Sequence, residues 1–312
     1  MKQLISLVLP VFNEEETLDV LYESLQVLLD QISRRRYRVE VLFINDGSSD
    51  RSMEKLIGYH HHDKRVKLVS FSRNFGQQMA VTAGLDIAQG DAVIIMDSDM
   101  QDPPEVSLKL IEKWEEGYDV VYAQRKTRKD SPFKKITSHF FYRVLDKLAD
   151  IRIPKDTGDF RLMDKKVVHA LRKFREHNRF MRGLVSYVGF KQTAILFERH
   201  ERYAGVTKYP LKKMVKLAID GITGFSTIPL RVITHFGFFV SLLSFLGIVY
   251  ALLLRVFFPD ITVSGWTMLI ISVLFIGGVQ MVMLGILGSY IGRIYTEIRH
   301  RPLYIVESVY SE

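Results

Sequence analysis

The 312-residue sequence contains no cysteine, which excludes disulfide bonds and thiolate-ligated metal centres. It also lacks the Gly-x-Gly-x-x-Gly fingerprint and the Walker A lysine after its β-type segments, which counts against a dehydrogenase and a P-loop phosphotransferase. Charge is nearly absent from residues 229–292, which carry only Arg231, Arg255 and Asp260. Residues 1–228 have the composition of a charged, soluble protein, so this change predicts a domain boundary.

Two segments of the apolar region are long enough to cross a membrane. Residues 232–254 and 266–288 each comprise 23 residues without a formal charge, and about 20 helical residues span the hydrocarbon core. Because the connector between them is short, we expect a hairpin whose two ends lie on the same side. A pair of buried core helices is the alternative, but uncharged runs of this length are unusual in soluble folds.

Basic residues on both sides of the hairpin predict its orientation. The connector carries only Arg255, so the positive-inside rule predicts a multi-pass protein of the inner (plasma) membrane with both termini cytoplasmic. Nucleic acid is the competing partner for a net charge of +8, but it would not explain the apolar segments. Residues 1–10 are too short for a cleavable signal peptide, and none is expected. The flanking basic residues are Lys208, Lys212, Lys213, Lys216 and Arg231 before the hairpin, and Arg293, Arg299 and Arg301 after it.

An amphipathic stretch precedes the hairpin. Residues 210–225 place apolar side chains on one helical face and lysines toward another, which favours a helix lying in the membrane interface. A surface helix packed on the soluble domain is the alternative. The predicted parts are a cytoplasmic domain at 1–206, a juxtamembrane helix at 207–228, the hairpin at 229–292 and a cytoplasmic tail at 293–312.

The N-terminal part alternates short β-type runs with longer helical ones. The helical stretch at 15–32 repeats apolar residues at helical spacing. Strands of nearly continuous Val, Ile and Leu separated by helices predict an α/β fold with a mainly parallel sheet covered on both faces. Looser patterns suggest helices near 134–148 and 164–174 and a β-type run at 190–197. The predicted strands lie at 4–10, 39–46, 66–71, 91–97 and 119–125.

Ligands bind at the carboxyl ends of the strands in such sheets, and here these ends are polar. Asp97 and Asp99 follow the fourth run, and paired carboxylates suit Mg²⁺ or Mn²⁺. Asp46 ends the second run and can accept hydrogen bonds from a base or ribose, while Gly47 lets a ligand approach the backbone. Helix capping is the alternative at these turns, by Asn13 with Glu16 after the first run and by Ser49 or Asp50 after the second.

The ordered motifs resemble the family-2 inverting glycosyltransferases of the GT-A fold, and in particular the polyprenyl-phosphate glycosyltransferases with a membrane hairpin. Dolichyl-phosphate mannose synthase and the bacterial undecaprenyl-phosphate glucosyltransferases are such enzymes. The resemblance covers nearly the whole chain and implies a Rossmann-like sheet. It is carried by LPVFNEEE, INDGSSD, SFSRNFGQQMA, DSDMQDPPE, DTGDFRLMD and RHERYAGVTKYPLKKM.

The resemblance also implies roles for individual residues. Asp159 is expected on the acceptor side as a candidate catalytic base, and Asp99 is expected to take part in catalysis through the metal. The expected nucleotide-sugar ligands are Pro10, Asn13, Glu14, Asp46, Gly47, Asn74, Asp97 and Ser98. The expected Mg²⁺ or Mn²⁺ site comprises Asp97, Asp99 and Gln101, and the expected lipid-phosphate and diphosphate ligands are Arg125, Arg161, Arg199, Arg202 and Lys208.

The implied reaction is inverting transfer of one sugar to a polyprenyl phosphate. The Gln-x-x-Arg-Trp motif of processive synthases is absent, since the comparable NRFMRG lacks the tryptophan. UDP-glucose is the expected donor, with UDP-N-acetylglucosamine and aminoarabinose donors open. Because a phosphate acceptor is already largely dianionic at pH 7, we expect Asp159 to orient it more than to remove a proton.

Two alternatives stay open. A glycosyltransferase with a lipid hydroxyl acceptor, such as diacylglycerol, would need Asp159 as a base. A catalytically silent scaffold that recruits a flippase or a second transferase is less favoured, because both acidic motifs are intact. The Gly-x-x-x-Gly spacing at 288–292 favours close helix packing, and we expect a homo-oligomer.

Overall fold

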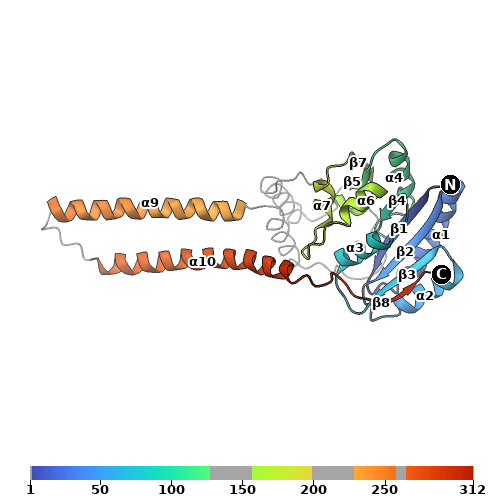
Figure 1. The fold of residues 1–312 in the computed structure, drawn as a ribbon, viewed down its shortest axis with the longest axis horizontal. Coiled ribbons are helices and arrows are strands. Elements are labelled where there is room, and N and C mark those ends of the chain that lie inside the picture. Colours follow the sequence, from blue (N-terminus) through green and yellow to red (C-terminus); the bar gives the residue numbers. More distant parts are fainter. Residues whose placement is uncertain (1, 127–156, 199–227, 258–264, 312) are drawn as a thin grey trace. The chain divides into compact units, whose positions relative to one another are not determined.

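A computed structural model describes residues 2–126, 157–198, 228–257 and 265–311 (Figure 1). The chain divides into two compact units. One comprises residues 1–221 together with 301–312, and the other comprises residues 222–300. The predicted helices near 134–148 and at 207–228 lie outside the described residues, except for Ile228 at the start of an apolar helix.

The first unit is built on a sheet of eight described strands (Figure 1). Strand β1 lies between β2 and β4, and β3 follows β2, all in parallel. The five N-terminal strands that the sequence predicts are therefore confirmed. The spatial order is β7 (Gln192–Phe197), β5 (Val120–Arg125), β6 (Thr157–Asp164), β4 (Ala92–Ile95), β1 (Leu4–Val11), β2 (Arg38–Asn45), β3 (Val66–Phe71) and β8 (Val306–Tyr310).

Helices cover both faces of this sheet because alternate residues of the buried strands face opposite sides. Leu7 belongs to a core that includes residues of α1 (Leu18–Arg34), α2 (Ser52–His62) and α4 (Val106–Glu115). Its neighbour Val8 lies directly against Gly84 of α3 (Gln77–Ile87), where a side chain would collide with it. The short helices α6 (Lys165–Leu171) and α7 (Met181–Tyr187) follow β6. The predicted α/β architecture with helices on both faces is confirmed.

Two strands were not predicted from the sequence, and both are antiparallel to their neighbours. Strand β6 lies between β4 and β5. Strand β8 pairs with the edge strand β3. The segment predicted as a tail, 293–312, thus contains the end of a helix and a strand that covers the sheet edge, where open backbone groups would otherwise invite pairing with other chains.

The second unit contains two long apolar helices, α9 (Ile228–Phe257) and α10 (Trp266–Ile298). By length and composition, both can cross a membrane, with candidate spans at Leu230–Gly247 and Leu269–Ile298. The helices approach each other near Gly237, where an added Cβ would lie 3.7 Å from Met283 Cε. These helices can form the predicted hairpin, and α10 continues ten residues beyond the predicted end at 288.

Candidate active site

Several of the predicted site residues in the described part of the chain meet at one edge of the sheet. Strands β1 to β4 are parallel, so their carboxyl ends share this edge. Strand β6 runs the other way, and Ile95 of β4 pairs with Arg161. Asp97 and Asp99, beyond the end of β4, and Asp159, near the start of β6, therefore lie at the same edge although about 60 residues separate them in sequence.

Asp46 at the end of β2 holds the loop at residues 72–76. Its carboxylate accepts hydrogen bonds from the backbone N–H groups of Phe75 (2.7 Å) and Gly76 (2.9 Å) and from Asn74 Nδ2 (2.9 Å). Asp46 is 2% exposed, and burial raises its pKa although the backbone donors oppose the shift. The Asp46 carboxylate thus binds Asn74 and the backbone of this loop, while the Asp46 N–H donates to Val11 O of β1 (2.8 Å). Nucleoside binding by Asp46 and Asn74 stays a prediction.

Gly47 explains how this loop comes so close to β2. Its φ is 64°, in the left-handed region that favours glycine. An added Cβ would lie 2.7 Å from Asn74 N and 2.8 Å from Arg73 Cα. The backbone of the 72–76 loop approaches this glycine, and close approach of a ligand to Gly47 stays a prediction.

Replacing Gly47 with alanine is expected to displace the 72–76 loop and to lower the free energy of unfolding by about 1 to 3 kcal/mol. The control is Gly58→Ala, because Gly58 lies inside α2 with nothing within 4 Å of an added Cβ, and this change should stabilise the helix by about 1 kcal/mol. Urea unfolding of both variants measures the difference. Equal stabilities would contradict the close approach of the loop.

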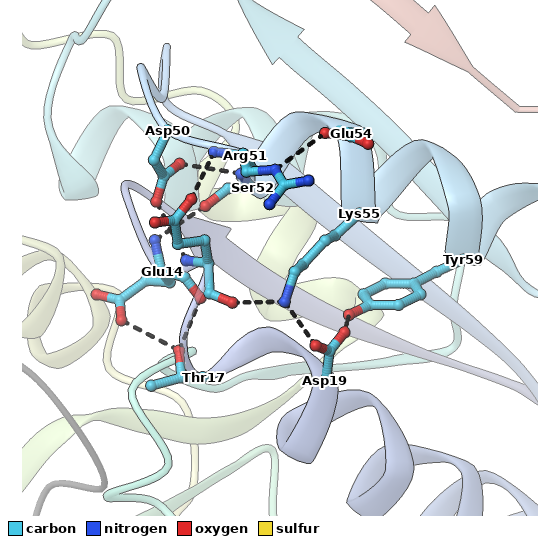
Figure 2. A network of polar contacts seen from close by, with 10 residues as sticks. Glu14, Thr17, Asp19, Asp50, Arg51, Ser52, Glu54, Lys55 and Tyr59 are labelled. Atoms are coloured by element: carbon cyan, nitrogen blue, oxygen red, sulfur yellow. Dashed lines mark hydrogen bonds and ion pairs between the residues drawn. The ribbon is translucent and has the colours of Figure 1, made fainter.

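Side chains also join the exits of β1 and β2. Asn13, with a φ of 53°, accepts a hydrogen bond from Ser49 N (2.8 Å) at its Oδ1 and donates its own N–H to Ser48 Oγ (3.0 Å). The N–H of Glu14 donates to Ser52 Oγ (2.9 Å), and the contacts continue to Asp50, Asp19 and Tyr59 (Figure 2). Asn13 and Glu14 are thus held in fixed positions beside β2.

The capping alternatives name the wrong N-cap residues. The N-cap of α1 is Thr17, not Asn13, and its side chain makes no cap hydrogen bond. The N-cap of α2 is Arg51, again without a side-chain cap bond, although Asp50 Oδ1 accepts from the N–H of Ser52 (3.0 Å). Polar residues at the two turns also bind across to each other, because the two strand exits are neighbours in the sheet.

The acidic exit of β4 is closely tied to its surroundings. Gln77 Nε2 donates to Asp97 Oδ1 (2.7 Å), and the N–H of Gln101 donates to Asp99 Oδ1 (3.2 Å). Ser98 is buried and donates to the carbonyl oxygen of Pro10 (2.9 Å), which fixes this turn against β1. The two aspartates are therefore presented at the sheet edge by a constrained turn.

The donor set at this turn fits a Mg²⁺ or Mn²⁺ ion shared with a ligand. In the part of the chain that the structure describes, no three His, Asp or Glu side chains are grouped to hold a metal. Asp97 and Asp99 supply two carboxylates, and Mg²⁺ is commonly bound by one or two carboxylates together with substrate phosphates. The side chains are hard oxygen ligands of the expected kind.

Asp159 is buried among positively charged groups. Arg182 Nε donates to its Oδ1 (3.0 Å), Gln78 Nε2 donates to its Oδ2 (3.2 Å), and Arg161 lies 3.9 Å from its Oδ1. Burial alone would raise the pKa of Asp159, but the charges of Arg182 and Arg161 outweigh it and hold the pKa below the usual 3.8. Asp159 is therefore ionised at neutral pH and is a weak base.

Arg161, which was expected to bind the lipid phosphate, is instead a buried partner of Asp159. It is 3% exposed, and its guanidinium donates to the carbonyl oxygens of Gly158 (2.8 Å) and Asp159 (3.3 Å). Burial lowers its pKa to about 10. Arg125 lies near the same strand, 3.9 Å from a Cβ placed on Gly158. Arg199, Arg202 and Lys208 lie outside the described residues.

Sequence reasoning missed Gln77, Gln78 and Arg182. The glutamines were visible in SFSRNFGQQMA and the arginine in NRFMRG, but their partners are distant in sequence. Only the antiparallel register of β6 brings Asp159 next to α3 and α7.

The mainly parallel mixed sheet with two aspartates after β4 agrees with the fold that the sequence motifs imply. The family model described as glycosyl transferase family 2 matches residues 6–172. The chain belongs to this family and is a glycosyltransferase.

Relatives match this chain over nearly its full length. An uncharacterized glycosyltransferase, YkcC of Bacillus subtilis (strain 168), is 52% identical over 98% of this chain and 94% of that protein. The bactoprenol glucosyl transferase of Shigella phage SfV is 44% identical over 97% and 98%. The prophage bactoprenol glucosyl transferase homolog of Escherichia coli (strain K12) is 43% identical over 98% and 99%. Solved structures match less closely: S. aureus TarS 1-349 is 16% identical over 62% of this chain and 58% of that one, with a TM-score of 0.42.

Proposed function

We propose that this glycosyltransferase transfers one glucosyl residue from UDP-glucose to the phosphate of a polyprenyl (undecaprenyl) phosphate, with inversion. The observation that carries this proposal is the match to proteins named bactoprenol glucosyl transferase over 97% of this chain. That match includes the two apolar helices as well as the catalytic unit.

The donor side of the reaction needs stabilisation of a leaving nucleoside diphosphate. Asp97 and Asp99 would hold a divalent cation there, which supplies Lewis-acid stabilisation of the developing charge when bound. Gln77 and the backbone N–H of Gln101 orient these carboxylates. Asn13, Glu14 and Asp46, at the neighbouring strand exits, are the proposed nucleoside side of the site.

On the acceptor side, the phosphate itself is the nucleophile, and it does not depend on a general base to be ionised. A phosphate monoester with a second pKa of about 6 is largely dianionic at neutral pH. The lowered pKa of Asp159 agrees with a carboxylate that stays ionised and orients neighbouring groups. Arg125, Arg199, Arg202 and Lys208 are proposed to bind the phosphates, since arginine forks match phosphate oxygens.

The apolar helices are proposed to anchor the enzyme in the inner membrane, with the catalytic unit and both termini on the cytoplasmic side. The excess of basic residues beside the helices supports this orientation. A polyprenyl phosphate keeps its head group at the same leaflet, so the anchored enzyme meets its acceptor in two dimensions.

The experiment that tests this function uses the full-length protein in membranes containing undecaprenyl phosphate and Mg²⁺ or Mn²⁺. Labelled UDP-glucose, UDP-N-acetylglucosamine and GDP-mannose are offered in parallel. We expect a lipid-linked glucose that mild acid releases, as a sugar phosphodiester should. Transfer to diacylglycerol alone, or transfer from none of the donors, would contradict the proposal.

A further inference from the structure

Two neighbouring glutamines at the start of α3 bind the two acidic parts of the site. Gln77 Nε2 donates to Asp97 Oδ1 over 2.7 Å, and Gln78 Nε2 donates to Asp159 Oδ2 over 3.2 Å. Asp97 follows β4 and Asp159 lies in β6, which are paired strands. One helical turn therefore contacts the carboxylate proposed for the donor side and the one proposed for the acceptor side.

The geometry of a helix explains how adjacent residues reach separate partners. Consecutive side chains of an α-helix do not face each other, because they project about 100° apart. At the first turn of α3, this divergence directs one amide toward the exit of β4 and the other toward β6. The N-cap residue of α3 is Gly76, whose φ is 99°. As a glycine, it has no side chain to cap the helix.

The orientation of the Gln78 amide is set by a second contact. Its Oε1 accepts a hydrogen bond from the N–H of Met181 (3.0 Å), the first residue of α7. Its Nε2 is therefore the end that faces Asp159. The next residue, Arg182, donates to the other oxygen of the same carboxylate. Gln78 thus joins α3, β6 and α7 around Asp159.

The start of α3 is itself fixed from two sides. Asp46 holds the 72–76 loop on one side. The segment that leads into β8 supports it from the other side, since Ser72 N donates to Ile305 O (3.1 Å). Tyr304 stacks on Phe71 with ring centroids 5.0 Å apart, and its hydroxyl donates to Asp86 of α3 (2.8 Å). The loop before the glutamines is therefore held by Asp46 and by the Ser72–Ile305 contact, while Tyr304 holds the other end of α3 through Asp86.

We propose that Gln77 and Gln78 are a pair of positioning residues: Gln77 fixes Asp97 for the donor diphosphate and Gln78 fixes Asp159 for the acceptor. This inference rests on the proposed function. It assigns Gln77 to the donor and Gln78 to the acceptor. If the two glutamines only stabilised the start of α3, replacing either one would affect both substrates alike.

The test replaces each glutamine with methionine, which keeps the length and removes the amide. Loss of a hydrogen bond to a charged group corresponds to a change of about 10- to 100-fold. Gln77→Met is expected to raise KM for the sugar nucleotide by that factor and to leave KM for undecaprenyl phosphate unchanged. Gln78→Met is expected to lower kcat/KM for undecaprenyl phosphate and to leave donor binding unchanged.

A second readout does not depend on turnover. Calorimetric titration with UDP-glucose in Mg²⁺ or Mn²⁺ should show weaker donor binding for Gln77→Met and wild-type binding for Gln78→Met. The matched control is Gln31→Met, an exposed glutamine of α1, which should behave as the wild type. Thermal unfolding of all three variants reports any general loss of stability.

The outcomes separate this inference from the proposed function. Equal losses for both substrates in both variants, in proportion to a lower Tm, would overturn the inference, as would wild-type kinetics in both. A wild-type enzyme that forms no lipid-linked product would overturn the proposed function. In that case the calorimetric comparison of Gln77→Met with Gln78→Met still decides whether the two glutamines differ in their effect on the donor.

Discussion

Replacing Asp97 or Asp99 with asparagine is expected to lower kcat by about 10²- to 10³-fold, the loss typical for removal of one electrostatic stabiliser of a transition state. Asparagine keeps an Oδ1 that can still accept from Gln77 Nε2 at position 97 and from Gln101 N at position 99. The turn after β4 should therefore keep its conformation while each variant loses one negative charge. The proposed cation ligand, and not the fold, is what changes.

The control for this prediction is Asp91→Asn. Asp91 immediately precedes β4, at the other end of the strand, and its Oδ2 accepts from Leu4 N (2.9 Å). This variant should keep the wild-type rate. The measurement is initial rate against Mg²⁺ or Mn²⁺ concentration for the three variants and the wild type. Wild-type kcat in both site variants at saturating metal would contradict the assignment.

The N-terminal strands could be predicted because β1 to β4 are short, largely buried runs rich in Val, Ile and Leu, and β5 begins with two buried valines. The same pattern pointed to the candidate site, since carboxyl ends of parallel strands share an edge. The structure places Asp46, Asp97 and Asp99 at this edge, and their roles stay predictions. The two apolar helices were equally visible, because runs of 23 uncharged residues are rare outside membrane-spanning helices.

Strands β6 and β8 could not be recognised by that pattern. Strand β6 contains Asp159, Arg161 and Asp164, which break the apolar run. The first two are buried, where Asp159 forms ion pairs with Arg161 and with Arg182. Strand β8 is five residues long and includes Glu307, so it resembles a polar tail. Its place beside β3 depends on a partner more than 200 residues away in sequence.

Arg161 shows where residue-by-residue reasoning fails. A basic residue in a motif near a phosphate site suggests an anion ligand, but the register of β6 buries this one beside a carboxylate. The ion pair with Asp159 joins residues two apart on one strand, both near the sheet edge. Its role is visible only when the burial of the two side chains is known.

Asp159→Asn is expected to lower the stability of the protein as well as its rate. The variant leaves Arg161 buried without its opposite charge and brings two amide donors together at Gln78, and removal of one partner of a buried ion pair costs about 3 kcal/mol. Because the pKa of Asp159 is depressed in the folded state, its contribution to stability is present above the unfolded pKa and is lost as pH falls through the folded value. The stability difference between wild type and variant should therefore be constant from pH 6 to 8 and shrink only in acid below about pH 4.

Arg161→Met is the matched variant that separates stability from function, since it breaks the same buried pair and keeps the carboxylate next to Arg182. Urea unfolding should give similar losses for the two variants. At pH 8, where the acceptor phosphate is fully ionised, Asp159→Asn should lose less rate than Asp97→Asn, and Arg161→Met should lose less than either. An Asp159→Asn enzyme that is as inactive as Asp97→Asn at every pH, while Arg161→Met stays active, would show that Asp159 removes a proton. That result would favour a hydroxyl acceptor, because a lipid phosphate has no proton left to remove at pH 8.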